Sequence, residues 1–106
     1  MKLSEAMIKG CAKTRPTKRF YFSFNGECAC ALGAAYLGAT GSVMERPDST
    51  KVIVSLHFLT GADLTQLAEH PVTGERTDYH AIIAELNDCF GWSREDIAAW
   101  LREQGL

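Results

Sequence analysis

The chain has 106 residues and a mass of 11.7 kDa, a size that fits one compact domain over residues 1–106. Hydrophobic residues make up 46% and charged residues 23% of the chain, which excludes intrinsically disordered, collagen-like and fibrous classes. No apolar run approaches the roughly 20 residues of a membrane span, and residues 1–13 lack the continuous apolar stretch of a signal peptide. We therefore expect a cytoplasmic protein with no membrane partner.

The formal net charge of -2 conceals a polarity along the chain. Residues 1–59 hold eight Lys and Arg against four acids (net +4), whereas residues 60–106 hold three against nine (net -6). The densest cationic stretch contains no acid and consists of Lys9, Lys13, Arg15, Lys18 and Arg19. Two interpretations stand: a site for an anionic partner, or a solvated loop that complements the acidic half.

The first predicted element is a helix over residues 5–13. Ser4 is placed to cap its first turn through the side-chain hydroxyl. Met7, Ile8 and Cys11 recur at helical spacing and are therefore expected on the buried face.

Residues 19–24 (Arg-Phe-Tyr-Phe-Ser-Phe) alternate in the manner of a strand. Phe20, Phe22 and Phe24 would lie on one side of it. The Asn25-Gly26 pair tolerates positive φ and ends the strand.

The alanine-rich stretch that follows predicts a central, buried helix over residues 28–39. Small residues such as Gly33 and Ala34 would let a neighbouring element approach closely, and Gly41 is a candidate left-handed cap.

Residues 43–50 read as a surface loop. The next apolar run, residues 51–59, begins with β-branched side chains and favours a strand, although a helix stays open. Pairing of this run with residues 19–24 would form a small two-stranded sheet covered by helices.

Capping signals predict three further helices. Thr60 and Asp63 introduce a short one over residues 61–69, and Asp78 and Ser93 each stand before an apolar helical stripe. The last two helices form an αα-hairpin. The predicted fold is α+β, with about five helices packed around a small two-stranded sheet.

The cysteines are expected to be thiols, because no disulfide framework is needed in a reducing compartment. On a helix, Cys28 and Cys30 would project about 200° apart, which argues against a shared metal ion. We therefore expect no metal and no cofactor, although the chain holds further potential ligands: Cys11, Cys89, His57, His70 and His80.

A cysteine-dependent hydrolase or transferase is one alternative function. Cys28 or Cys30 would lie near a helix N-terminus, which lowers a thiol pKa, with His57 or His80 as the base. Asn87 or Asp88 could orient that base. In the competing interpretation the thiols are small core residues and Asn87 and Asp88 are solvated or capping residues.

The histidines also have structural interpretations. His57 is expected to be a hydrogen-bonded core residue, His70 to lie at a helix C-terminus, and His80 to lie on the surface of a first helical turn.

Single-stranded nucleic-acid binding through Lys18, Arg19, Phe20 and Tyr21 is a second alternative, because cations beside aromatic rings suit exposed bases. The final helix pair has a helix-turn-helix outline, but its closing helix is net negative and therefore unsuited to phosphates.

Two segments carry a resemblance: Cys30-Ala-Leu-Gly-Ala-Ala35, and Leu86-Asn-Asp88 followed by Gly91-Trp-Ser-Arg-Glu-Asp-Ile97. They resemble a family of small uncharacterised proteins of bacteria and their phages. The resemblance implies a compact helical domain and no known activity, so it assigns no catalytic residue.

The caps and apolar stripes explain most distinctive residues, and the charge polarity is the feature that packing does not require. We therefore expect a non-enzymatic protein that binds another macromolecule, is phage-derived and acts on a host system. The expected partner is another protein, with nucleic acid as the less favoured choice. The cationic stretch and the acidic half are the candidate contact faces.

Overall fold

The computed structural model describes residues 1–23 and 25–106. Within them, five helices and two small sheets form the α+β fold that the sequence predicts. The elements in chain order are α1 (Leu3–Cys11), β1 (Arg15–Pro16), β2 (Cys28–Ala29), α2 (Ala31–Thr40), α3 (Ser49–Thr60), β3 (Leu67–Glu69), β4 (Arg76–Asp78), α4 (Tyr79–Asp88) and α5 (Arg94–Glu103).

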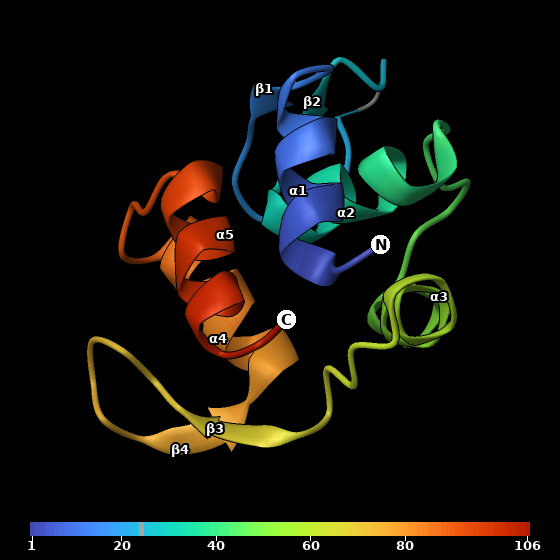
Figure 1. Cartoon of the computed structure of the whole chain (residues 1–106). Helices are drawn as coiled ribbons and strands as arrows, with labels where there is room; N and C mark the ends of the chain where they lie inside the picture. The colour runs from blue at the N-terminus through green and yellow to red at the C-terminus, as the bar shows by residue number, and fades with distance from the viewer. Residues whose placement is uncertain (24) are drawn as a thin grey trace.

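Helices α1 and α2 form the most closely packed pair of elements (Figure 1). Gly10 of α1 lies against the Ala34 carbonyl of α2, and Gly38 of α2 lies against the Ala6 carbonyl of α1. Absence of a side chain at both glycines lets the two backbones touch. The prediction of a central, buried helix with a left-handed glycine cap is confirmed, since Gly41 has φ +80°.

The C-terminal αα-hairpin, α4 and α5, is also confirmed and packs beside α1 (Figure 1). Asp78 Oδ1 accepts the Ala81 N–H at 2.7 Å, and Ser93 Oγ accepts the Asp96 N–H at 3.0 Å, as their capping positions predict. The chain ends meet because Ser4 N–H donates to the Leu106 carbonyl at 3.1 Å.

One hydrophobic core joins these helices. Its largest fully buried apolar side chains come from α1, α2, α3, the loop before β3, α4 and α5: Leu3, Met7, Leu32, Val52, Leu56, Leu64, Ile82, Ile83, Leu86, Ile97 and Leu101.

The prediction of a strand over residues 19–24 is wrong. Phe22 makes one isolated bridge to Ala29, Phe20 is 67% exposed and Arg19 adopts φ +67°. Phe24 lies outside the described residues. The short β1 instead pairs with β2 in parallel, Arg15 beside Cys28.

The prediction of a strand over residues 51–59 is also wrong, because this run belongs to α3. Asp48 Oδ1 accepts the Lys51 N–H at 2.9 Å, and Gly61 ends the helix at φ +78°. These two caps and the burial of Val52 and Leu56 outweigh the small preference of β-branched residues for strands.

The predicted helix over residues 61–69 does not form. Asp63 Oδ1 accepts the Thr65 N–H at 2.9 Å and so builds a local turn. The chain then enters β3, which pairs antiparallel with β4, Ala68 beside Thr77. This hairpin crosses one end of the molecule (Figure 1).

Two helix starts differ from prediction. Helix α1 begins at Leu3, so Ser4 is buried inside its first turn, and Ile8 is exposed. Helix α2 begins at Ala31 rather than Cys28, because Cys28 is in β2 and Cys30 is the N-cap.

Candidate macromolecule-binding site

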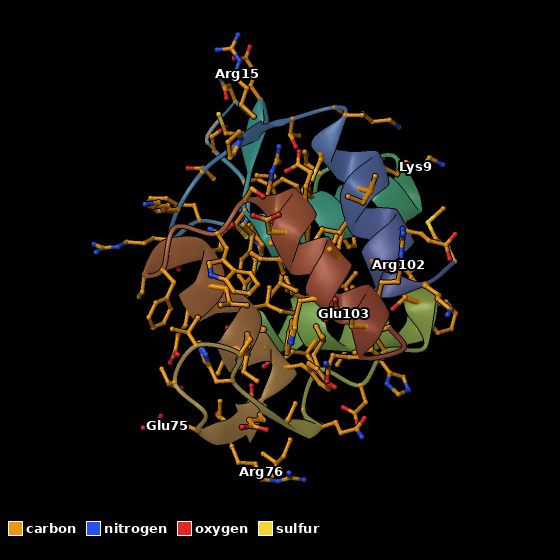
Figure 2. All side chains as sticks on the ribbon, turned by 60° about the vertical axis from the view of Figure 1, so that its left-hand side comes forward. Lys9, Arg15, Glu75, Arg76, Arg102 and Glu103 are labelled. Carbon is orange, nitrogen blue, oxygen red and sulfur yellow. The ribbon has the colours of Figure 1, made fainter. Side chains whose placement is uncertain are left out.

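The predicted binding residues lie at and beyond the end of α1. Lys9 is exposed on the last turn of α1, and Lys13, Arg15, Lys18 and Arg19 are exposed along residues 13–19, here called the basic segment. Figure 2 shows Lys9 and Arg15 in the upper half of the view, whereas Glu75 and Arg76 lie at the opposite end.

None of these five side chains lies within ion-pair distance of a carboxylate of the described residues. The ion pair among the described residues joins Lys51 to Asp48, and the His70 ring contacts the Glu85 carboxylate. The positive charge of the basic segment is therefore available to a partner, while the segment itself is almost without secondary structure.

Asn87 holds this segment from the end of α4. Its Nδ2 donates to the Thr17 carbonyl at 2.9 Å, and its Oδ1 accepts the Ala31 N–H at the start of α2 at 3.1 Å. With 6% of its surface exposed, Asn87 joins the basic segment to the central helix from within the protein.

Asp88 makes a second attachment. Its Oδ1 accepts the Arg19 N–H at 2.8 Å and a second bond from Asn87 Nδ2 at 2.8 Å. Arg19 has φ +67°, a left-handed conformation that costs a residue with a side chain about 1–2 kcal/mol. The Asp88 bond helps to hold Arg19 in that conformation.

Arg94, the first residue of α5, makes the third attachment. Its Nη2 donates to the Thr14 carbonyl at 2.8 Å, and its Nη1 donates to Thr14 Oγ1 at 2.7 Å and to the Ala29 carbonyl at 3.3 Å. We call Asn87, Asp88 and Arg94 the hairpin clamps, because all three reach the basic segment from the C-terminal hairpin.

The two candidate nucleophiles lie in β2 and at the start of α2. Cys30 Sγ accepts the Gly33 N–H at 3.5 Å, and burial raises the pKa of this thiol. Cys28 is half-buried in β2, so the premise that both thiols lie on one helix is wrong. Within residues 1–23 and 25–106, no three Cys, His, Asp or Glu side chains are grouped to hold a metal ion.

No hydrogen bond among the described residues joins a candidate base to a thiol. His57, expected in the core, is exposed on α3. His80 Nε2 lies 2.8 Å from the Tyr21 hydroxyl, which is itself 3.1 Å from Ser49 Oγ. Cys30 is connected to Tyr21 by its backbone N–H, and among the described hydrogen bonds no thiol is paired with an imidazole.

His70 also differs from expectation, since it is 1% exposed beside the β3–β4 turn. Its Nδ1 accepts the N–H groups of Val72 and Thr73 at 3.1 and 3.3 Å. Its Nε2 lies 3.1 Å from Glu85 Oε2, without the alignment of a hydrogen bond. His70 therefore organises the turn.

His80 makes stability depend on pH. Burial lowers its pKa below the ordinary value of 6.5, and the Asp78 carboxylate acts in the opposite direction. The unfolded chain thus takes up this proton first, so the contribution of His80 is fully present above its ordinary pKa and is lost as the pH falls. We expect the urea midpoint to fall between about pH 7.5 and about pH 5.5.

The matched variants for this measurement are His80→Gln and His57→Gln. The first should reduce the fall in the urea midpoint, whereas the second changes an exposed ring and should leave it as in the parent. An equal fall in all three proteins would contradict the role given to His80.

The two aromatic residues beside the basic segment differ in their exposure to solvent. Phe20 is exposed, but Tyr21 is half-buried and its hydroxyl contacts Ser49 and His80. A base could therefore stack on Phe20 beside Lys18 and Arg19, but Tyr21 does not extend that surface.

The sequence reasoning missed the hairpin clamps. Asn87 and Asp88 were expected to orient a base or to be solvated or capping residues, and Arg94 was given no role of its own. An arginine directly after a helix N-cap, in a helix whose first turn also holds Glu95 and Asp96, carries no sequence signal of burial.

Comparison with known proteins gives no match: no protein-family model, curated protein or solved structure matches this chain. None of the helices in the described part of the chain has the length and apolar character that crossing a membrane requires.

Proposed function

We propose that this protein is a non-enzymatic binding protein whose basic segment contacts an acidic surface of another protein. The observation that carries the proposal is the attachment of this segment by the hairpin clamps, which lie about 70–80 residues away in sequence. A loop held in this way is ordered before it meets a partner, so binding costs less conformational entropy.

Charge supports a protein partner over nucleic acid. The chain is net negative, and its acidic residues 60–106 would repel an extended phosphate backbone. A local acidic patch on a protein needs to match only the basic segment. The resemblance to small proteins of bacteria and their phages directs the search for that partner to bacterial host proteins.

The test measures binding of a fluorescein-labelled oligoglutamate peptide by fluorescence anisotropy. We expect Lys18→Glu with Arg19→Glu to weaken binding at least about tenfold, because two attractions near 1 kcal/mol each become repulsions. The matched control, Arg76→Glu with Arg102→Glu, changes the net charge equally at exposed positions outside the segment and should change binding less than about twofold.

Equal loss in both double variants would contradict the proposal, because it would show that net charge alone governs binding. A single-stranded oligonucleotide that displaces the peptide and binds the parent protein more tightly would instead favour the nucleic-acid alternative.

A further inference from the structure

A cleft of about 300 Å³ opens beneath the basic segment, between residues 16–18 and the start of α5. Its lining residues are Pro16, Thr17, Lys18, Asn87, Gly91, Trp92, Ser93 and Arg94. The volume is at the lower end of the range of about 300–1,000 Å³ for ligand sites, which suits a side chain or a small molecule.

Arg94 brings an uncompensated positive charge to this cleft. The residue is 4% exposed, and its guanidinium donates only to the neutral oxygens of Thr14 and Ala29. Its Nε–H is buried without a partner, and no carboxylate of the described residues lies within ion-pair distance of the guanidinium. Because a buried charge without a counter-charge is costly, an anion in the cleft would stabilise Arg94.

Two other features of the cleft also favour a negatively charged ligand. Lys18 also lines the cleft, and α5 begins in it. The first N–H groups of an α-helix have no partners inside the helix, and of these the Asp96 N–H is bound by Ser93 Oγ. The Glu95 and Asp96 carboxylates in that first turn are exposed and are not among the lining residues, so they reduce the local potential without occupying the site.

The remaining wall is apolar. Trp92 is half-buried and lines the cleft together with Pro16 and Gly91. The ligand that matches both the cationic groups and the apolar wall is an anionic group on a short apolar stem, as in the side chain of glutamate.

We propose that this cleft binds a carboxylate on a short stem, the group by which an acidic protein partner inserts beneath the basic segment. The inference rests on the proposed function and adds the chemistry of one contact: Lys18, Arg94 and the start of α5 hold the carboxylate, and Trp92 packs on its stem.

The experiment titrates the full ¹⁵N-labelled chain with N-acetylglutamate and, separately, with neutral N-acetylglutamine amide. The reporters are the Arg94 Nε–H, the Trp92 indole N–H and the backbone N–H groups at the start of α5. We expect saturable shifts at these signals with the carboxylate and none with the amide. The Arg94 Nε–H should shift because the carboxylate changes the electric field around the guanidinium.

Two matched variants separate a site from a general charge effect. Lys18→Gln, in the cleft wall, should weaken N-acetylglutamate binding about fivefold. Arg76→Gln removes one positive charge at an exposed position outside both the basic segment and the cleft lining, and should leave the affinity unchanged.

Shifts that do not saturate, or equal weakening by both variants, would overturn the carboxylate site. Inorganic phosphate binding at least about tenfold more tightly than N-acetylglutamate would also overturn it. Oligoglutamate binding that needs Lys18 and Arg19 but moves none of the cleft signals would overturn the inference while leaving the proposed function intact. Saturable cleft shifts, together with peptide binding that is unchanged in the Lys18→Glu and Arg19→Glu variant, would overturn the proposed function and leave the carboxylate site intact.

Discussion

Replacement of Gly38 by alanine is expected to destabilise the protein by about 3 kcal/mol or more, a large part of the 5–15 kcal/mol typical of a small domain. A Cβ at this position would overlap the Ala6 carbonyl of α1, and its next contacts would also be backbone atoms. Backbone atoms cannot rotate away, so α1 and α2 would have to separate along their whole contact. Urea denaturation followed by circular dichroism measures the loss.

The matched control is Gly41→Ala at the end of the same helix. Gly41 has φ +80°, but an added Cβ would meet nothing within 4 Å, so only the conformational cost of about 1–2 kcal/mol is expected. If the two alanine variants were equally stable, the contact of α1 with α2 through Gly38 would not be the tight one described here.

The helices were predictable where caps and spacing agree. Asp78 and Ser93 precede apolar stripes that both signals assign to helices, and the hairpin followed from them. Helix α3 was missed because its Val-Ile-Val run favours a strand by tenths of a kcal/mol. The residues that indicate a helix are the caps at its two ends, Asp48 and Gly61. They are sufficient only together with the packing of Val52 and Leu56 into the core.

The predicted strand over residues 19–24 failed for a different reason. Alternation of aromatic residues predicts an extended chain, but a strand also needs a partner that takes its N–H and carbonyl groups. Tyr21 and Ser23 do bond the backbone of residues 28–30, but the Arg19 N–H donates to Asp88, a residue 69 positions away. No pattern within residues 19–24 indicates that a distant carboxylate accepts this N–H, so the error could not be detected from the sequence of the segment.

The same reasoning applies to the candidate site. The cationic positions could be read from the sequence, because charge is a property of each residue. Their arrangement could not, because it depends on Asn87, Asp88 and Arg94, whose contacts with Thr14, Thr17 and Arg19 span 69–80 positions. The ordered shape of the basic segment is therefore a property of the folded chain.

Asn87→Ala is expected to cost about 3 kcal/mol of stability. The substitution removes the acceptor of the buried Ala31 N–H and the donor to the part-buried Thr17 carbonyl. It also removes the bond to Asp88 Oδ1, which still accepts the Arg19 N–H. A buried polar group left without a partner costs about 1–3 kcal/mol, and two are affected. The urea midpoint should fall accordingly, and oligoglutamate binding should weaken even where the variant is fully folded, because residues 17–19 lose an attachment.

Asn25→Ala is the matched control, because the Asn25 side chain accepts hydrogen bonds from Ser23 Oγ and the Glu27 N–H, but in an exposed turn. Water replaces such partners, so the expected cost is about 1 kcal/mol or less and peptide binding should not change. A folded Asn87→Ala protein that binds the peptide as tightly as the parent would show that the ordered shape of the basic segment contributes nothing to recognition. Weaker binding at equal charge would separate the contribution of shape from that of Lys18 and Arg19 themselves.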